Sequence, residues 1–74
     1  MVAVNISPYK IDAQGNEIVS CTVVANTLPS PLPTTGAGIT NLDGHNRFAP
    51  MSVLYVVGSG AVYIANENGE FIAQ

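Results

Sequence analysis

The last third of the chain, residues 48–74, consists of short apolar runs that scarcely alternate with polar residues. A strand with one solvated face alternates, so these strands are expected to be covered on both faces. Glycine and asparagine separate the runs, and Asn68-Gly69 in particular suits a tight hairpin because both residues accept positive φ. The predicted strands and turns are, in order, 53–57, Gly58-Ser59-Gly60, 61–65, Glu67-Asn68-Gly69 and 70–73.

The first third predicts a short strand and a hairpin. Residues 2–6 are expected to form a short strand that Pro8 ends or places at a sheet edge, because proline cannot donate to a strand ladder. Residues 9–11 and 17–25 then flank a turn at 12–16 that is rich in turn-forming residues. In the longer strand, the predicted core face carries Val19, Cys21, Val23 and Ala25.

The middle of the chain is expected to be a connecting arm. Three prolines between Pro29 and Pro33 favour an extended path that joins two sheet regions or runs along a neighbouring subunit. Nowhere do apolar residues recur with helical spacing. We therefore expect one all-β domain over 1–74, a small antiparallel sheet or a meander or barrel-like unit. It divides into an N-terminal hairpin region (1–27), a Pro/Gly-rich arm (28–50) and a C-terminal meander (51–74).

A chain of 74 residues forms a core that supplies about 3–5 kcal/mol of net stability unless a staple, a metal or a partner helps. Cys21 is the only cysteine and His45 the only histidine, so we expect neither a disulfide nor a metal cage. Only 9% of the residues are charged, whereas 47% are apolar. This balance predicts that oligomerisation completes the domain.

Several kinds of partner are excluded on composition. Lys10 and Arg47 are the only basic side chains, too few for a phosphate-backbone surface. The longest apolar run, 53–57, is far shorter than the roughly 18–20 residues that span a bilayer. The start of the chain lacks the pattern of a signal peptide, so we expect assembly in the cytoplasm. We expect no nucleic acid, membrane or cofactor.

Four motifs have a structural and a functional interpretation. Leu32-Pro33-Thr34-Thr35-Gly36 matches a sortase pentapeptide but lacks the following apolar segment and basic tail. Asp43-Gly44-His45-Asn46 lacks the carboxylate spacing of a calcium loop, and His45 with Asp43 and Cys21 or a serine has no evident oxyanion site. Tyr55 and Tyr63, on adjoining strands, fit a cross-strand pair better than a sugar-stacking platform. We therefore predict no catalytic residues.

One ordered set of residues resembles a known family. It comprises Leu32-Pro33-Thr34-x-Gly36, Ile39 and Leu42, Phe48-Ala49-Pro50-x-Ser52, Tyr63-Ile64-Ala65 and Gly69-Glu70-Phe71. Over residues 28–74 this order is similar to short bacteriophage head-fibre or capsid-decoration proteins. The resemblance implies a non-enzymatic virion protein, trimeric, attached to the major capsid protein on the outer capsid surface. The chain has no repetitive shaft or distal receptor-binding domain, so it corresponds to a fibre base or a compact decoration unit.

We expect the meander to supply an oligomer core around a threefold axis and the arm to supply further contacts. The predicted oligomer core is Val53, Tyr55, Val57, Val62, Ile64, Phe71 and Ile72. The possible arm contacts are Leu28, Leu32, Pro33, Ile39, Leu42 and Phe48. Two alternatives remain open, a small cell-surface or carbohydrate-binding β module and a phage tail or baseplate component.

Overall fold

The computed structural model describes all 74 residues and contains eight strands and no helix, which confirms the all-β prediction. The chain therefore has no helix with the length and apolarity needed to cross a membrane. The strands are β1 (Val2–Val4), β2 (Lys10–Ile11), β3 (Glu17–Val19), β4 (Thr22–Ala25), β5 (Arg47–Phe48), β6 (Val53–Val56), β7 (Ala61–Ala65) and β8 (Phe71–Ala73).

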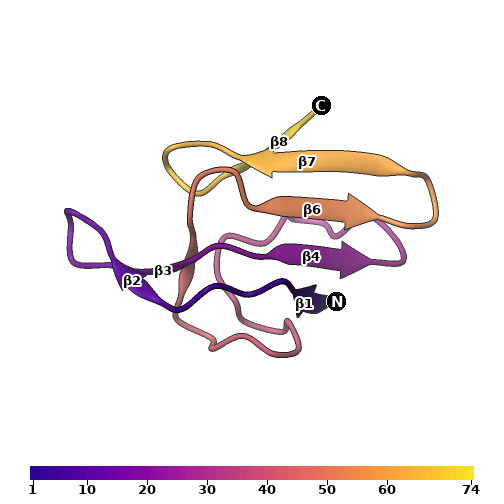
Figure 1. Ribbon diagram of the computed structural model, residues 1–74. Helices are drawn as coiled ribbons and strands as arrows, with labels where there is room; N and C mark the ends of the chain where they lie inside the picture. The colour runs from indigo at the N-terminus through magenta and orange to yellow at the C-terminus, as the bar shows by residue number, and fades with distance from the viewer.

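The strands form two sheets. A five-stranded sheet has the order β1-β4-β6-β7-β8, and a three-stranded sheet has the order β2-β3-β5. Figure 1 shows the strands of the larger sheet side by side, with the β2–β3 hairpin projecting beyond them at one end. The predicted meander is confirmed as β6, β7 and β8, which pair antiparallel in sequence order.

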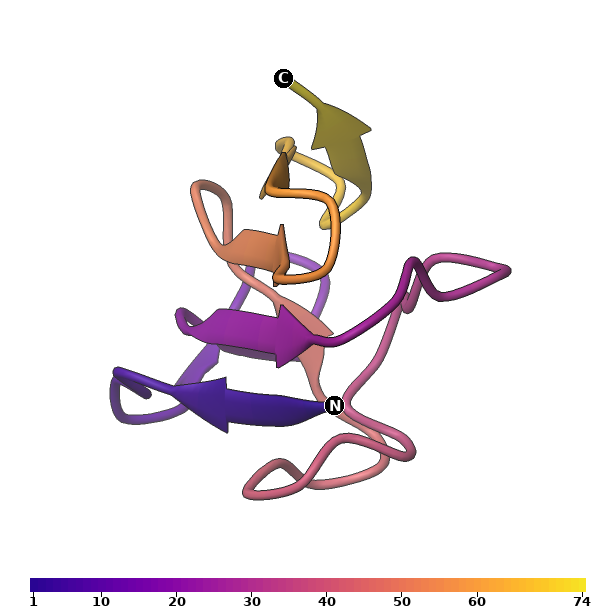
Figure 2. The ribbon, with the colours of Figure 1, turned by 90° about the vertical axis from the view of Figure 1, so that its right-hand side faces the viewer.

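The prediction of a purely antiparallel sheet is wrong at two places. β4 pairs parallel with β6, and β3 pairs parallel with β5, so both sheets are mixed. A parallel pair needs a long crossover connection, since its second strand must start at the same end as the first. Residues 26–52 are that connection, and Figure 2 shows part of them looping out to one side of the larger sheet.

The core lies between the inner face of the larger sheet and this crossover. The predicted face of the long N-terminal strand is confirmed, because Val19, Cys21, Val23 and Ala25 are all buried. The sequence did not predict β5, whose Phe48 is also buried. The ring of Phe48 packs on that of Phe71, with centroids 4.8 Å apart and the planes tilted by 53°.

Ser52 forms hydrogen bonds with the backbone between β3 and β4, where the chain passes from one sheet to the other. The predicted strand 17–25 is interrupted between β3 and β4, although its alternation continues through Cys21. The buried Ser52 hydroxyl donates to the Val19 carbonyl (3.3 Å) and accepts from the Cys21 N–H (3.4 Å). A residue of the crossover therefore satisfies the Cys21 N–H, which has no backbone partner, and shares the Val19 carbonyl with the Ala49 N–H (2.9 Å).

The last turn confirms the role predicted for Gly69. This residue has a φ of 78°, which is the left-handed region. A Cβ there would also come within 2.9 Å of the Phe48 carbonyl oxygen. Glycine is thus required both by the turn and by the close approach of β5.

We predict that Ser52→Ala lowers the free energy of unfolding by about 1–3 kcal/mol, because it leaves the buried Cys21 N–H without an acceptor. Urea unfolding followed by circular dichroism would measure the change. Ser59→Ala is the matched control, since the Ser59 hydroxyl accepts only from the Ala61 N–H in an exposed turn. Equal losses of stability in both variants would contradict the role given to Ser52.

Candidate functional site: an uncharged sheet face

The face of the five-stranded sheet that points away from Phe48 is apolar across all five strands. We call it the outer face. Its register places Val24 beside Tyr55 and Tyr55 beside Val62. The outer face consists of Val2, Val4, Thr22, Val24, Val53, Tyr55, Val62, Ile64 and Ile72, with Val57 following β6 in the same alternation.

These side chains are partly buried by one another but remain accessible. Tyr55 is 39% exposed, Val4 41% and Ile72 49%, whereas Leu54 on the opposite side of β6 is fully buried. Five strands at a spacing of about 4.8 Å make this surface about 19 Å wide. Contiguous apolar patches of this kind are typical of interaction sites.

No charged residue lies in any strand of the larger sheet. The charged side chains all belong to the smaller sheet, the loops and the turns: Lys10, Asp12, Glu17, Asp43, Arg47, Glu67 and Glu70. The outer face therefore offers a partner neither an ion pair nor an ionic repulsion. Thr22 and Tyr55 supply its only side-chain hydroxyl groups.

Most of the predicted oligomer core lies on this face. Six of the seven residues share it, and Phe71 alone lies on the other side, packed on Phe48. Sequence patterning could not separate the two sides, because β6, β7 and β8 are apolar on both. The separation comes from what covers each side in space.

The predicted arm contacts are mostly used within the chain. Ile39 and Phe48 are buried in the core, and Leu32 and Leu42 pack against it. Pro33 is half-buried, and only Leu28, at 53%, is well exposed. The arm thus covers the inner face of its own sheet.

The two tyrosines do not form the pair expected from the sequence. Tyr55 pairs with Val62 on the outer face, whereas Tyr63 pairs with Leu54 and packs against the core. Facing residues on adjoining strands share a side of the sheet, and these two tyrosines are one position out of register. Both the cross-strand pair and the sugar-stacking platform are therefore wrong.

The LPTTG segment has a packing role. The Gly36 N–H donates to the Asn46 carbonyl (3.1 Å), and its carbonyl accepts from the Ile39 N–H (3.0 Å). A Cβ on Gly36 would collide with the Asp43 carbonyl and the Asn46 side chain. Gly36 thus lets the arm lie directly against the 43–46 loop.

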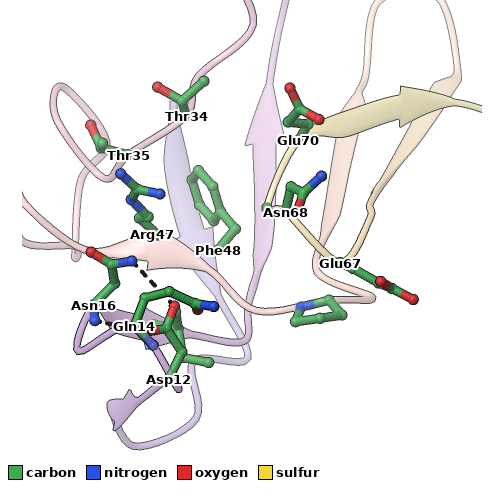
Figure 3. Close-up of a pocket in the computed structure, with 13 residues that line it drawn as sticks. Asp12, Gln14, Asn16, Thr34, Thr35, Arg47, Phe48, Glu67, Asn68 and Glu70 are labelled. Carbon is green, nitrogen blue, oxygen red and sulfur yellow. Dashed lines mark hydrogen bonds between the residues drawn. The ribbon is translucent and has the colours of Figure 1, made fainter.

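A polar groove of about 980 Å³ lies between the smaller sheet, the arm and the β7–β8 turn. Figure 3 shows Arg47 between the Thr34–Thr35 segment and the turn that carries Asp12 and Asn16. Glu67 and Glu70 lie on the other wall. The ring of Phe48 lines the groove but is almost wholly buried, so it gives no stacking surface for a sugar.

Asp12 organises the turn at one end of this groove. Its carboxylate accepts hydrogen bonds from the backbone N–H groups of Asn16 (2.7 Å) and Gln14 (3.0 Å). The bond from Asn16 is the main cause that lowers the pKa of Asp12, and the nearby positive charge of Arg47 acts in the same direction. The carboxylate is thus held in its charged form as a turn acceptor.

The 43–46 loop gathers a second polar cluster that was not predicted. Glu17 Oε1 lies 3.4 Å from His45 Nε2, and Asp43 completes a set of three ligand-type atoms within 4.8 Å of one another. These side chains are the ones that could hold a metal ion. The sequence singled out Asp43 and His45, but Glu17 is distant in sequence and joins them only through the fold.

The catalytic arrangement considered from the sequence is not assembled around Cys21. This thiol is buried in the core cluster, and burial raises its pKa, so the nucleophilic thiolate is disfavoured. His45 is instead largely exposed beside Glu17.

Comparison of the chain with protein-family models, with curated proteins and with solved structures found no match.

Asp12 generates a prediction on pH. A carboxyl whose folded pKa is lowered stabilises the fold above its unfolded pKa of about 4, and this contribution disappears as the pH falls through the folded value. Wild type should therefore be more stable than Asp12→Asn at pH 7, and the difference should shrink below about pH 4. Urea unfolding at a series of pH values would measure it. A difference that stays constant down to pH 2 would contradict the assignment.

Proposed function

We propose that this protein is a non-enzymatic structural protein that assembles with copies of itself through the outer face. The observation that carries the proposal is the complete lack of charge in the five strands of the larger sheet. When another apolar surface covers these five strands, apolar area is removed from water, and this stabilises the assembled state. The chain's own outer face is such a surface.

The energetic balance of a small domain supports self-assembly. A core of this size supplies little net stability, and Cys21, the only cysteine, cannot form an internal disulfide that would stabilise it. Covering the outer face removes apolar area from water at about 25 cal/mol per Å². All the charged groups lie elsewhere, so copies can approach through this face without desolvating a charge.

We further propose that the assembly is a homotrimer attached to the outer surface of a phage capsid, as a decoration unit or fibre base. The support is the ordered set of motifs between residues 28 and 74 that resembles head-fibre proteins. In a threefold arrangement the outer faces of three sheets surround the axis, and the charged loops and the smaller sheet lie away from it. The partner is the major capsid protein, in a virion assembled in the bacterial cytoplasm.

We predict that Tyr55→Lys abolishes assembly through the outer face, and with it the trimer, while the protein stays folded. A lysine at the centre of the outer face would have to be desolvated in the assembly but is solvated in the monomer. Sedimentation velocity at micromolar concentration would give the oligomeric state, and circular dichroism would verify the fold.

Ile11→Lys is the matched control for this experiment. Ile11 is 67% exposed in β2, outside the larger sheet, so the change adds the same charge without touching the outer face. It should leave the oligomer intact. A wild-type protein that is monomeric at micromolar concentration would overturn the proposal of self-assembly.

We predict that the protein binds preformed capsid shells. Shells of the major capsid protein encoded in the same genome would be purified without this chain, mixed with it and sedimented. Stoichiometric co-sedimentation is the expected result. Recovery of the protein in the supernatant, together with its detection by immunogold labelling on phage tails, would refute the capsid assignment and leave self-assembly unaffected.

A further inference from the structure

The two edges of the five-stranded sheet differ in how their backbone groups are paired. At the β1 edge, the Ala3 N–H donates to the Thr40 carbonyl (3.0 Å), and the Thr40 N–H donates to the Met1 carbonyl (3.1 Å). The Asn41 side chain donates to the Ala3 carbonyl (3.2 Å). The crossover thus covers this edge, as is common where a sheet must not pair further.

The β8 edge is open. Hydrogen bonds from Gln74 N–H to the Val62 carbonyl (3.0 Å) and from Asn66 N–H to the Glu70 carbonyl (2.9 Å) fix which residues of β8 face β7. In an antiparallel pair such residues alternate, so Ile72 also directs its backbone groups to β7. Phe71 and Ala73 therefore direct their N–H and C=O groups outward, where the chain supplies no backbone partner.

We infer that β8 pairs antiparallel with β8 of a second copy, about a twofold axis through Ile72. The outward N–H and C=O groups belong to residues 71 and 73. An antiparallel second copy must therefore pair its own residues 71 and 73 with them. Only the register that places Phe71 opposite Ala73 uses both residues of each strand, and it forms four hydrogen bonds. Shifting it by two residues pairs β8 with residue 69, where Gly69 has left the extended conformation.

The side chains suit this register. A large residue, Phe71, lies opposite a small one, Ala73, and no charged side chain occurs in the strand. Ile72 faces its own copy on the outer face, where it is 49% exposed. The pairing therefore extends one apolar face continuously across two chains.

This contact is separate from the packing of outer faces proposed above. It depends on backbone groups at an edge, whereas the face contact depends on side chains across the sheet. It can be tested in the Tyr55→Lys background, which removes the face contact. A negative result for the β8 pairing in this background therefore leaves the packing of outer faces untouched, and the reverse also holds.

The test is disulfide trapping in a Cys21→Ala, Tyr55→Lys background. Residues facing each other at a non-hydrogen-bonded antiparallel position have Cα atoms about 4.5 Å apart, which a disulfide can span. Ile72→Cys should therefore form a covalent dimer under mild oxidation. Ile64→Cys is the matched control, because in the paired sheets the two copies of residue 64 are separated by three strand spacings, about 14 Å.

A proline variant tests the hydrogen bonds. Adding Ala73→Pro to Ile72→Cys removes an outward N–H from each copy and keeps the bonds to β7, so dimer formation should fall by about tenfold or more. Gln74→Pro removes the N–H that bonds Val62 and should leave trapping unchanged. Dimer yields that are equal for Ile72→Cys and Ile64→Cys, or unaffected by Ala73→Pro in protein that circular dichroism shows to be folded, would overturn the inference.

Discussion

The parallel pairing of β4 with β6 joins the two halves of the chain, and the rest of the structure depends on it. It places the N-terminal strands and the C-terminal meander in one sheet, with Thr22 beside Val53 and Ala25 beside Val56. Parallel strands require a long crossover. In this chain the crossover is the Pro/Gly-rich arm, which covers the inner face in place of a helix and carries Phe48 into the core.

The same arrangement separates charge from apolar surface. Because the arm, the hairpin and the turns carry all the charged residues, the larger sheet presents its second face without any. All the charged groups except Lys10 lie in the polar groove or in the cluster of Glu17, Asp43 and His45. One side of the molecule is therefore suited to apolar packing, and the charged groups remain in contact with water.

The strands and turns were predictable to the extent that local chemistry determines them. The alternation of Val19, Cys21, Val23 and Ala25 identified a buried face, and Asn68-Gly69 identified the last turn. β5 was not predictable, because two residues are too short for any periodicity to be detected. The parallel pairings were missed for a related reason, since pairing between distant strands leaves no mark in local sequence.

The sequence by itself determined that the chain is all-β, that the strands of its C-terminal meander are apolar on both sides and that no internal disulfide stabilises it. Only the tertiary structure decided which side of each strand the chain covers for itself. Tyr55 and Tyr63 illustrate this. They are identical residues on neighbouring strands, yet they lie on opposite faces of the sheet, Tyr55 accessible and Tyr63 packed on the core. The physical reason is that burial depends on what the crossover brings onto the sheet, and a strand that is apolar on both faces specifies no preference between them.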